Sequence, residues 1–289
     1  MPDTCLPGFG DHLSTFLLLI DMSSTDQTDA SQPERVLRCS GLHVSHDGEV
    51  ILRGLDLEII KGEVVAVVVE SELAARLIPR IFIGIESAEA GEIEINGNVL
   101  NGLSETKKLQ LRREVGYLFH NSGLMSNLSV WYNVALPALY HTRFKDVQGV
   151  GEYVDVLLNR CGLSGSSRLR PAALDESTKK KVALARAWVM SPGFLILEDP
   201  LMDIDTGSGG DLLDLAFGPS PDEWHDRDPR PSDPGVLITS QGLHEGLFRY
   251  VDRMVIISKG EKVFSGDPKK FDRRGKIYPG DLLNKREAS

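Results

Sequence analysis

The sequence predicts an α/β fold built around a mostly parallel sheet, and three observations support this prediction. Val64 to Val69 and Phe194 to Leu197 are unbroken apolar runs, which is typical of parallel strands buried on both faces. The first run is followed by a short stretch of helix formers, Leu73 to Phe82, so a strand, a tight connection and a helix succeed one another. Asp47-Gly48 and Asn96-Gly97 are hairpin signals between alternating segments, which indicates an additional antiparallel portion.

The remaining elements follow in chain order from alternation, helix formers and turn residues. Further strands are predicted at Val36–Leu42, Glu49–Ile59, Gly91–Ile95, Val115–Phe119, Val236–Thr239, Arg253–Ser258 and Glu261–Phe264, the last two around a Lys259-Gly260 turn. Helices are predicted at Leu103–Arg113, Trp131–Tyr140, Gly151–Cys161 and Lys179–Met190, so residues 121–190 are mainly helical. Residues 218–235 hold five prolines and many acids, which predicts a long surface loop.

Composition limits the class of protein. With 289 residues, 41% hydrophobic residues and a mean hydropathy of −0.14, the chain has the composition of a soluble globular protein. A net charge of −10 argues against nucleic acid as a partner, because neutralising phosphates needs clustered Lys and Arg. Cys5, Cys39 and Cys161 are isolated, which suits a reducing cytosol better than a disulfide framework or a zinc site. The sequence contains no run of about 18 apolar residues, so no membrane span is predicted.

Three parts are expected along the chain. Residues 1–34 are a disordered or misassigned N-terminal extension, with Met1 and Met22 as alternative first residues. Residues 35–268 form the α/β domain, with a helical subdomain at 121–190 and the proline-rich loop at 218–235. Residues 269–289 form a C-terminal tail.

The strand Val64 to Val69, the tight connection after it and the helix Leu73 to Phe82 have the arrangement in which α/β proteins bind phosphate. The reason is that a helix N-terminus offers unpaired N–H groups and partial positive charge. A working P-loop reads G-x-x-x-x-G-K-[ST]: glycines wrap the phosphates, Lys neutralises them and the hydroxyl holds Mg²⁺. Laid on this pattern without gaps, the chain places Val69, Glu72 and Ala74 where glycines would stand, Ala75 at the Lys position and Arg76 at the Ser/Thr position. The degenerate P-loop is therefore Val69, Glu70, Ser71, Glu72, Leu73, Ala74, Ala75, Arg76 and Leu77.

These replacements oppose nucleotide binding. A β-branched Val69 resists positive φ, so the loop cannot form the same nest of N–H groups. Glu70 and Glu72 would repel a triphosphate, by about 4 kcal/mol for like charges about 4 Å apart at an effective dielectric near 20. Arg76 would offset part of that repulsion. Pro79 favours a first-turn position, which raises the alternative that the helix begins nearer Leu77 and takes its anion-attracting end away from the phosphate position.

Several strings in family order resemble the nucleotide-binding subunit of an ABC transporter over residues 35–268. They are Leu52–Ile59, Gly62–Val65, Gly91–Gly97, Lys181–Ala187 and Leu195–Pro200. Within that family, Leu118-Phe119 and Gly123–Pro137 are most similar to the ATPases of Mce and Mla type lipid transporters. The resemblance implies a P-loop NTPase-like fold with a mostly parallel core sheet, an antiparallel β subdomain and an inserted helical subdomain.

The resemblance also assigns ancestral roles to individual positions. The signature motif that contacts the γ-phosphate reads Leu174, Asp175, Glu176, Ser177 and Thr178, which places carboxylates where Ser and Gly are expected. The strand-end acids are Glu198 and Asp199, and Asp205 matches the acid of the next loop. His120 replaces the glutamine that contacts Mg²⁺ and water, and Ser240 replaces the switch His. His46 stands where an aromatic residue would stack on adenine. For His120, the alternative to a role at this ancestral position is a purely structural one.

The preferred hypothesis is a pseudo-ATPase: a cytoplasmic subunit at the inner face of the membrane that docks on an integral-membrane permease without hydrolysing ATP. Docking would use Gly123, Leu124, Met125, Leu128, Trp131 and Tyr132, although an ordinary buried role for these residues is an equal alternative. No cofactor and no metal site are expected. A divergent ATPase using Arg76 and Glu198 would instead bind ATP and Mg²⁺. The third hypothesis is a helper in a heterodimer with another ABC subunit; a homodimer also stays open.

Overall fold

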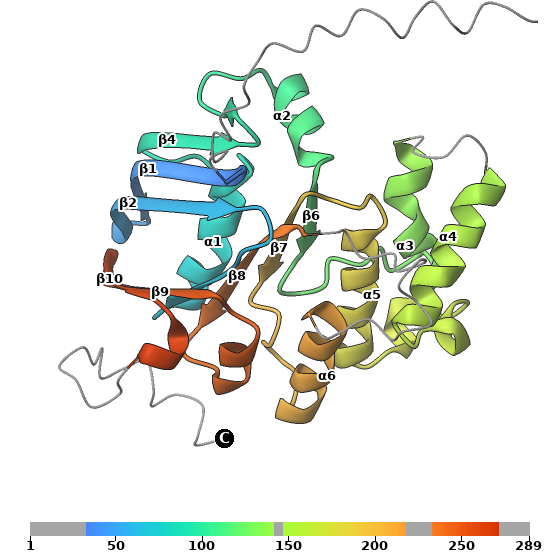
Figure 1. Cartoon of the computed structure of the whole chain (residues 1–289). Coiled ribbons are helices and arrows are strands. Elements are labelled where there is room, and N and C mark those ends of the chain that lie inside the picture. Colours follow the sequence, from blue (N-terminus) through green and yellow to red (C-terminus); the bar gives the residue numbers. More distant parts are fainter. Residues whose placement is uncertain (1–32, 142–146, 218–232, 272–289) are drawn as a thin grey trace, which may run out of the picture. The chain divides into compact units, whose positions relative to one another are not determined.

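The computed structural model describes residues 33–141, 147–217 and 233–271. All of them belong to a unit formed by Pro33–Ser289, which is separate from Met1–Gln32. The predicted N-terminal extension therefore lies almost wholly outside the described residues, as do positions 218–232 of the predicted surface loop and 272–289 of the predicted tail. Figure 1 shows the helices and strands of the described part.

Two sheets form the framework, as the α/β prediction requires. The core sheet has the strand order β10-β9-β3-β8-β7-β6, in which only β10 runs antiparallel to its neighbour. The second sheet, β2-β1-β4-β5, is antiparallel throughout. The strands are β1 Arg35–His46, β2 Glu49–Ile60, β3 Val64–Val69, β4 Ala90–Ile95, β5 Asn98–Val99, β6 Val115–Leu118, β7 Phe194–Glu198, β8 Gly235–Gln241, β9 Arg253–Ser258 and β10 Glu261–Gly266.

The apolar runs occupy the middle of the core sheet for a simple reason. β3 pairs with β8 along one edge and with β9 along the other, and its alternate residues pack into apolar clusters on opposite faces of the sheet, so all of its residues after Val64 are buried. β7 is buried along its whole length. Continuous apolar sequence is what such strands require, because neither face meets water.

The helices match the predicted ones, with shifts at their ends and one addition. They are α1 Glu72–Phe82, α2 Glu105–Arg112, α3 Val130–Tyr140, α4 Val147–Arg160, α5 Glu176–Trp188 and α6 Thr206–Phe217. Helix α6 was not predicted from the sequence, because Thr206 to Gly210 is rich in glycine and lacks helix formers. The alternative that α1 begins near Leu77 is wrong: it begins at Glu72 and carries Pro79 in its interior.

Two large apolar clusters and a smaller one around Val68, Met254 and Ile256 form the core of the described residues. One joins the antiparallel sheet, α1 and one face of the core sheet, with Phe82 and Ile78 of α1 fully buried between them. The other joins the opposite face of the core sheet to α3, α4, α5 and α6, around Trp188. Figure 1 shows α3, α4 and α5 gathered beyond β6 and β7. The carboxyl ends of β3, β7 and β8 lie at one edge of the core sheet, between these two large apolar clusters. This is the edge at which α/β sheets are expected to bind ligands.

Candidate functional site

The connection from β3 to α1 is only two residues long, Glu70 and Ser71, and the second of these caps the helix. Ser71 has an extended backbone (φ −114°, ψ 144°), and its Oγ accepts a hydrogen bond from the N–H of Ala74 at 3.0 Å. Ser is a preferred N-cap residue, and one N–H of the first turn is thereby satisfied internally. The Glu70 carboxylate turns towards the β9–β10 turn, where it accepts from the Ser258 hydroxyl at 2.5 Å and from the Lys259 N–H at 3.3 Å.

Pro79 is tolerated inside α1 because β8 supplies what the proline removes. A proline has no N–H to donate to the carbonyl four residues earlier, which here is that of Ala75. The buried Thr239 hydroxyl donates to this carbonyl oxygen at 2.7 Å. This contact joins α1 to β8 and explains why the helix can begin at Glu72.

A valine at position 239 is therefore expected to lower the free energy of unfolding by about 1–3 kcal/mol, since it leaves the buried Ala75 carbonyl without a donor. Urea denaturation followed by circular dichroism measures the loss. Thr239→Ser keeps the hydroxyl and is the matched control. Adding Pro79→Ala to Thr239→Val returns an N–H to the same carbonyl and should recover part of the loss; equal stability of Thr239→Val and the natural chain would contradict the assignment.

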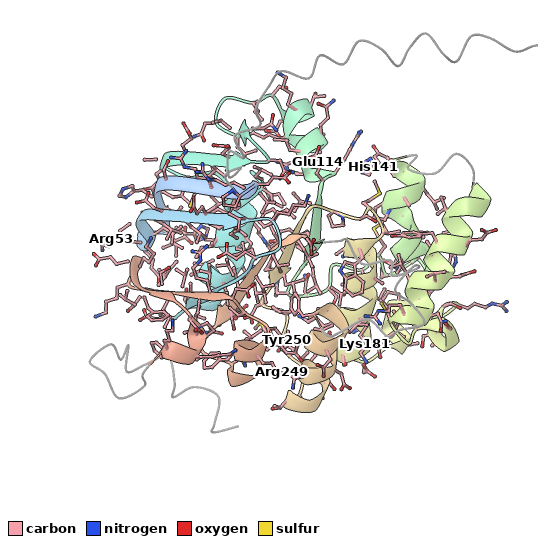
Figure 2. All side chains as sticks on the ribbon, in the orientation of Figure 1. Arg53, Glu114, His141, Lys181, Arg249 and Tyr250 are labelled. Atoms are coloured by element: carbon pink, nitrogen blue, oxygen red, sulfur yellow. The ribbon has the colours of Figure 1, made fainter. Side chains whose placement is uncertain are left out.

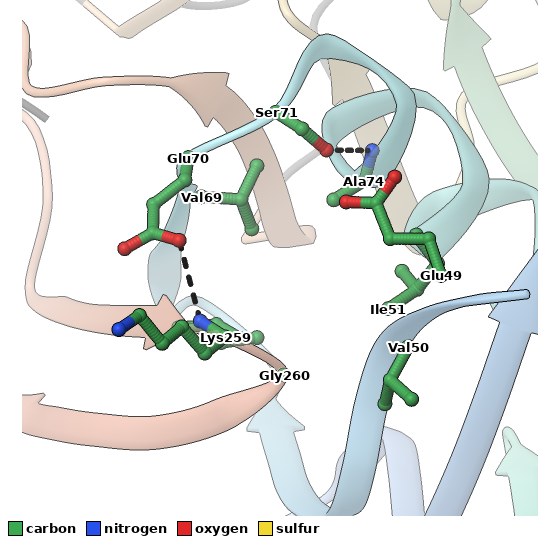
Figure 3. Close-up of a pocket in the computed structure, with 10 residues that line it drawn as sticks. Glu49, Val50, Ile51, Val69, Glu70, Ser71, Ala74, Lys259 and Gly260 are labelled. Carbon is green, nitrogen blue, oxygen red and sulfur yellow. Dashed lines mark hydrogen bonds between the residues drawn. The ribbon is translucent and has the colours of Figure 1, made fainter. Parts of the chain in front are cut away.

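The pocket beside this connection is small. Figure 3 shows it between Glu70 and Ser71 on one side and Glu49 to Ile51 of β2 on the other, with Lys259 and Gly260 at its edge. Its volume is about 50 Å³, whereas ligand sites for drug-sized molecules are roughly 300–1,000 Å³. His46, the residue expected at the adenine, lies outside this lining: its side chain is 47% exposed and its Nε2 lies 3.6 Å from the Asp47 carboxylate.

The strand-end acid Glu198 is the most heavily engaged carboxylate of the site. It ends β7 and is fully buried. Arg80, from the last turn of α1, donates to it through Nε at 3.2 Å and through Nη2 at 2.9 Å. The Tyr117 hydroxyl donates at 2.6 Å, and His120 Nδ1 lies 2.7 Å from Oε1. We call Glu198, Arg80, Tyr117 and His120 the Glu198 cluster.

The electrostatics of the cluster follow from burial around one negative charge. The hydrogen bond to Glu198 raises the pKa of Arg80 above its ordinary value. Burial, followed by the charge of Glu198, raises the pKa of Tyr117, so this phenol stays protonated and acts as a donor. A bidentate guanidinium and two further contacts satisfy a carboxylate about as completely as protein groups can.

A second buried cation lies next to the cluster. Lys180 of α5 is 1% exposed, and its Nζ donates to the His120 carbonyl and lies 3.5 Å from the Asp199 carbonyl. Burial lowers the pKa of Lys180, while the nearby charge of Asp199 opposes that change. Asp199 is itself fully buried in a left-handed backbone conformation (φ 39°), with its N–H donating to the Thr239 carbonyl at 3.1 Å.

The signature and switch positions serve local structure. Asp175 caps α5 by accepting from the Thr178 N–H at 2.7 Å, and this contact lowers the pKa of the carboxyl. Glu176 pairs with Lys179 at 2.6 Å. The Ser240 hydroxyl is buried and donates to the Gly242 carbonyl at 3.2 Å. Asp205 likewise accepts from the N–H of Ser208 at 2.9 Å, ahead of α6.

The segment that carries the predicted docking residues, Ser122 to Ser129, is held by hydrogen bonds from side chains of α5 and α3. Arg186 of α5 donates to the carbonyls of Ser122 and Gly123 at 2.7 and 2.6 Å. The fully buried Asn133 accepts from the Met125 N–H at 2.7 Å and donates to three carbonyls of the same segment. Of the predicted docking residues, Gly123, Met125 and Tyr132 are exposed, whereas Leu124, Leu128 and Trp131 are half-buried.

Sequence reasoning missed Arg80, Tyr117, Lys180 and Thr239. Arg80 did carry a signal, because it is the one charge in the last turn of an otherwise apolar stretch of α1. Lys180 sits within a run of three lysines, a pattern that is more typical of a solvated helix face than of a buried cation. Its burial follows from the helical period, which turns one of three successive residues inwards.

The comparisons with known proteins decide the family. A model of the ABC transporter family matches residues 52–202. The chain belongs to this family. It is 30% identical over 165 residues to the lipoprotein-releasing system ATP-binding protein LolD of Roseobacter denitrificans, covering 57% of this chain and 72% of that protein. It is 28% identical over 259 residues to the methionine import ATP-binding protein MetN 1 of Acinetobacter baylyi, covering 89% of this chain and 65% of that protein.

Solved structures agree on the fold. A dimeric bacterial ABC transporter cassette, MJ0796, superposes with a TM-score of 0.70 at 18% identity, covering 81% of this chain and all of that one. CbiO1 from Clostridium perfringens, part of an ABC transporter complex, superposes with a TM-score of 0.68 at 23% identity. The superposition covers 82% of this chain and 90% of the CbiO1 chain. The α/β, P-loop NTPase-like prediction is thus confirmed.

No helix among residues 33–141, 147–217 and 233–271 is both long and apolar enough to cross a membrane. Within the same ranges, His, Cys, Asp and Glu side chains do not gather in threes in a way that would hold a metal ion.

Proposed function

We propose that this ABC family chain is a pseudo-ATPase subunit, which docks on a membrane permease and does not hydrolyse ATP. The Glu198 cluster is the observation that carries the proposal. Both oxygens of the strand-end carboxylate are bound by Arg80, and Tyr117 and His120 complete its contacts. In this proposal, the Arg80 guanidinium takes the place beside Glu198 that the family resemblance assigns to a metal ion.

The chain's residues do not fit Mg²⁺ at this position. Mg²⁺ demands near-octahedral oxygen ligands and uses carboxylates that can face the ion. Glu198 is fully buried and would have to give up a bidentate ion pair with Arg80 before it could take a metal. The side chain at position 120 is an imidazole that already lies 2.7 Å from Glu198.

The residues do not fit a triphosphate either. The Ser71 hydroxyl already accepts a hydrogen bond from the Ala74 N–H at the start of α1, and no Lys lies in the segment from Val69 to Leu77. The Glu70 carboxylate lines the adjoining pocket and would repel phosphate oxygens. The pocket beside the connection has a volume of about 50 Å³, which is well below the roughly 300–1,000 Å³ of sites that enclose drug-sized ligands.

Isothermal titration calorimetry with MgATP tests the proposal. We expect no binding tighter than about 1 mM, which corresponds to roughly −4 kcal/mol, and no phosphate release above the buffer background. A LolD protein purified and measured in the same way controls for the assay. Micromolar affinity for MgATP would contradict the pseudo-ATPase assignment.

The divergent ATPase required Arg76 to replace the missing Lys. Arg76 Nη1 instead pairs with Glu72 one turn earlier, at 3.3 Å, and Glu198 is bound by Arg80. Both groups that this alternative needed are engaged within the chain, so the contacts favour the pseudo-ATPase.

The rest of the proposal concerns partners and place. Relatives named as ATP-binding proteins of import and release systems support a role beside a membrane permease, at the cytoplasmic face. Gly123, Met125 and Tyr132 offer the exposed part of the docking segment. The likeness of Gly123–Pro137 to Mce and Mla type ATPases supports a lipid as the transported class. Pairing with a second ABC subunit or with another copy would provide the usual two cassettes; MJ0796 was solved as a dimer.

A further inference from the structure

A separate pocket is formed by the end of α1, the connection from α1 to β4, β4 itself, the loop before α2 and α2. Its volume is about 160 Å³. Ile81, Ile93 and Leu100 give it an apolar floor, and all three are buried. Glu86 and Lys108 are the charged residues of its described lining. The remaining lining consists of three glycines and the side chains of Asn101, Ser87 and Ala88. We call the hollow lined by these residues the α2 pocket.

Hydrogen bonds within the chain hold the walls of the α2 pocket in place. The Asn101 side chain accepts from the Ile93 N–H at 3.2 Å and donates to the Gly91 carbonyl at 3.1 Å. The connection that carries Glu86 is tied back to α1, because the Glu86 N–H donates to the Arg80 carbonyl at 3.3 Å. The pocket is therefore formed before an occupant arrives, which lowers the free-energy cost of binding.

Of the two charges that line the α2 pocket, only that of Glu86 is available. Lys108 Nζ lies 2.9 Å from the carboxylate of Glu105, one turn earlier on α2, and Arg112 Nη2 lies 3.8 Å from the same carboxylate. Glu86 is exposed, and no described side chain forms an ion pair or hydrogen bond with its carboxylate. The stretch Gly84–Glu94 contains four glutamates and no Lys or Arg, so the surface on this side of the pocket is acidic.

Exposed apolar side chains stand next to the lining residues. Ile85 is 47% exposed and lies between Gly84 and Glu86, both of which line the α2 pocket. Val99 is 37% exposed and directly precedes the lining residue Leu100. An occupant that belongs to a protein segment has neighbouring residues with which to cover these side chains, whereas a free small cation does not.

We propose that the α2 pocket receives a Lys or Arg side chain from a basic segment of a partner protein. The aliphatic stem of this side chain lies on the apolar floor, and its cation pairs with Glu86. The proposal goes beyond the pseudo-ATPase assignment and does not depend on it, because no residue of the Glu198 cluster lines the α2 pocket. Its lining also contains none of the predicted site or docking residues.

The size and the chemistry of the α2 pocket select this occupant. A volume of about 160 Å³ suits one side chain and is well below the roughly 300–1,000 Å³ of sites that enclose drug-sized ligands. Lys and Arg combine an apolar stem with a charged head, which matches an apolar floor beside one available carboxylate. An acidic side chain would meet Glu86 with like charge, and an apolar one would leave that carboxylate without a partner.

The pocket itself is tested on the purified full chain with N-acetyl-arginine amide as the probe. We expect this probe to shift the NMR methyl resonances of Ile81 and Ile93 saturably, and N-acetyl-norleucine amide, which has the apolar stem without the cation, to give no saturable shift. Glu86→Gln should weaken binding of the arginine probe about threefold, within the range of a single exposed ion pair. Saturation that is absent with the arginine probe, or equal with the norleucine probe, would overturn the pocket.

Glu261→Gln is the matched control, because Glu261 is an exposed glutamate on β10. It follows Gly260, whose carbonyl accepts from the Arg53 N–H at 2.8 Å. Figure 2 shows Arg53 well apart from Glu114, which follows the end of α2. The control variant should bind the arginine probe as the natural chain does; an equal loss in both variants would show a response to net charge alone and would overturn the pocket.

The partner is tested by photo-cross-linking of the full chain in its native cells, with p-benzoylphenylalanine in place of Ser87 in the lining. We expect a cross-linked partner peptide that contains Lys or Arg, and at least a tenfold lower yield when Glu86→Arg is added. Changing that partner cation to Glu should restore the yield with Glu86→Arg. A peptide without Lys or Arg, an unchanged yield with Glu86→Arg, or no cross-link would overturn the partner. A cross-link to a second copy of the chain would assign the pocket to self-association and overturn a foreign partner. MgATP calorimetry decides the proposed function separately.

Discussion

Replacing Arg80 by methionine is expected to lower the free energy of unfolding by about 3–5 kcal/mol, because it leaves the fully buried Glu198 carboxylate without a cation. Tyr117 and His120 remain as its neighbours, but neither brings the fixed charge of a guanidinium. Urea denaturation of the purified chain measures the effect. A cassette whose strand-end acid is kept free for a metal would tolerate the same change.

Arg76 provides the control from the same helix. Its guanidinium is paired with Glu72 at 3.3 Å on a partly exposed surface, so Arg76→Met should cost less than about 1 kcal/mol. The double variant Arg80→Met with Glu198→Leu removes both buried charges and should recover most of the loss, since an apolar pair of similar volume can replace a buried ion pair. Unchanged stability of Arg80→Met would show that Glu198 does not depend on Arg80 and would reopen the metal site.

Alanine at position 91 is expected to cost about 2–5 kcal/mol, from steric overlap together with a left-handed backbone. Gly91 has φ 98°, and a Cβ there would lie 2.6 Å from the Gly41 carbonyl oxygen and 2.7 Å from the Leu42 Cα. These are main-chain atoms of β1, so they cannot move without disturbing the pairing of β1 with β4. Thermal and urea unfolding measure the loss.

Gly97 separates the two causes. It also has positive φ, at 75°, but a Cβ there would meet nothing within 4 Å. Gly97→Ala should therefore cost only about 1–2 kcal/mol, the price of the left-handed conformation alone. If both alanine variants were equally stable, close approach of β4 to β1 would not be the reason for glycine at position 91.

The sheet was largely predictable because its signals are local. An unbroken apolar run such as Val64–Val69 needs burial on both faces, and turn pairs such as Asp47-Gly48 accept the positive φ that a hairpin demands. Helix α6 escaped prediction because packing against α5 and against the short helix Glu245–Arg249, rather than its glycine-rich first turn, stabilises it. The start of α1 was ambiguous because Pro79 is compatible with the helix interior only when Thr239 supplies a donor.

The candidate site was predictable in its missing residues and unpredictable in its replacements. The sequence shows directly that Lys is absent from the phosphate loop and that Glu198 and Asp199 end a strand. It does not show that Arg80 binds Glu198, because the two are 118 residues apart and no periodicity connects them.

By itself, the sequence determined the α/β class, the succession of strands along the chain and the family strings. These depend on burial patterns and turn residues that lie within a few positions of one another in the sequence. Only the tertiary structure decided what the altered site does with its charges. Glu198 is paired with Arg80, a cation from within the chain. The physical reason is that a charge acts through space on whichever partner the fold brings near it, and along the chain that partner is at no fixed distance.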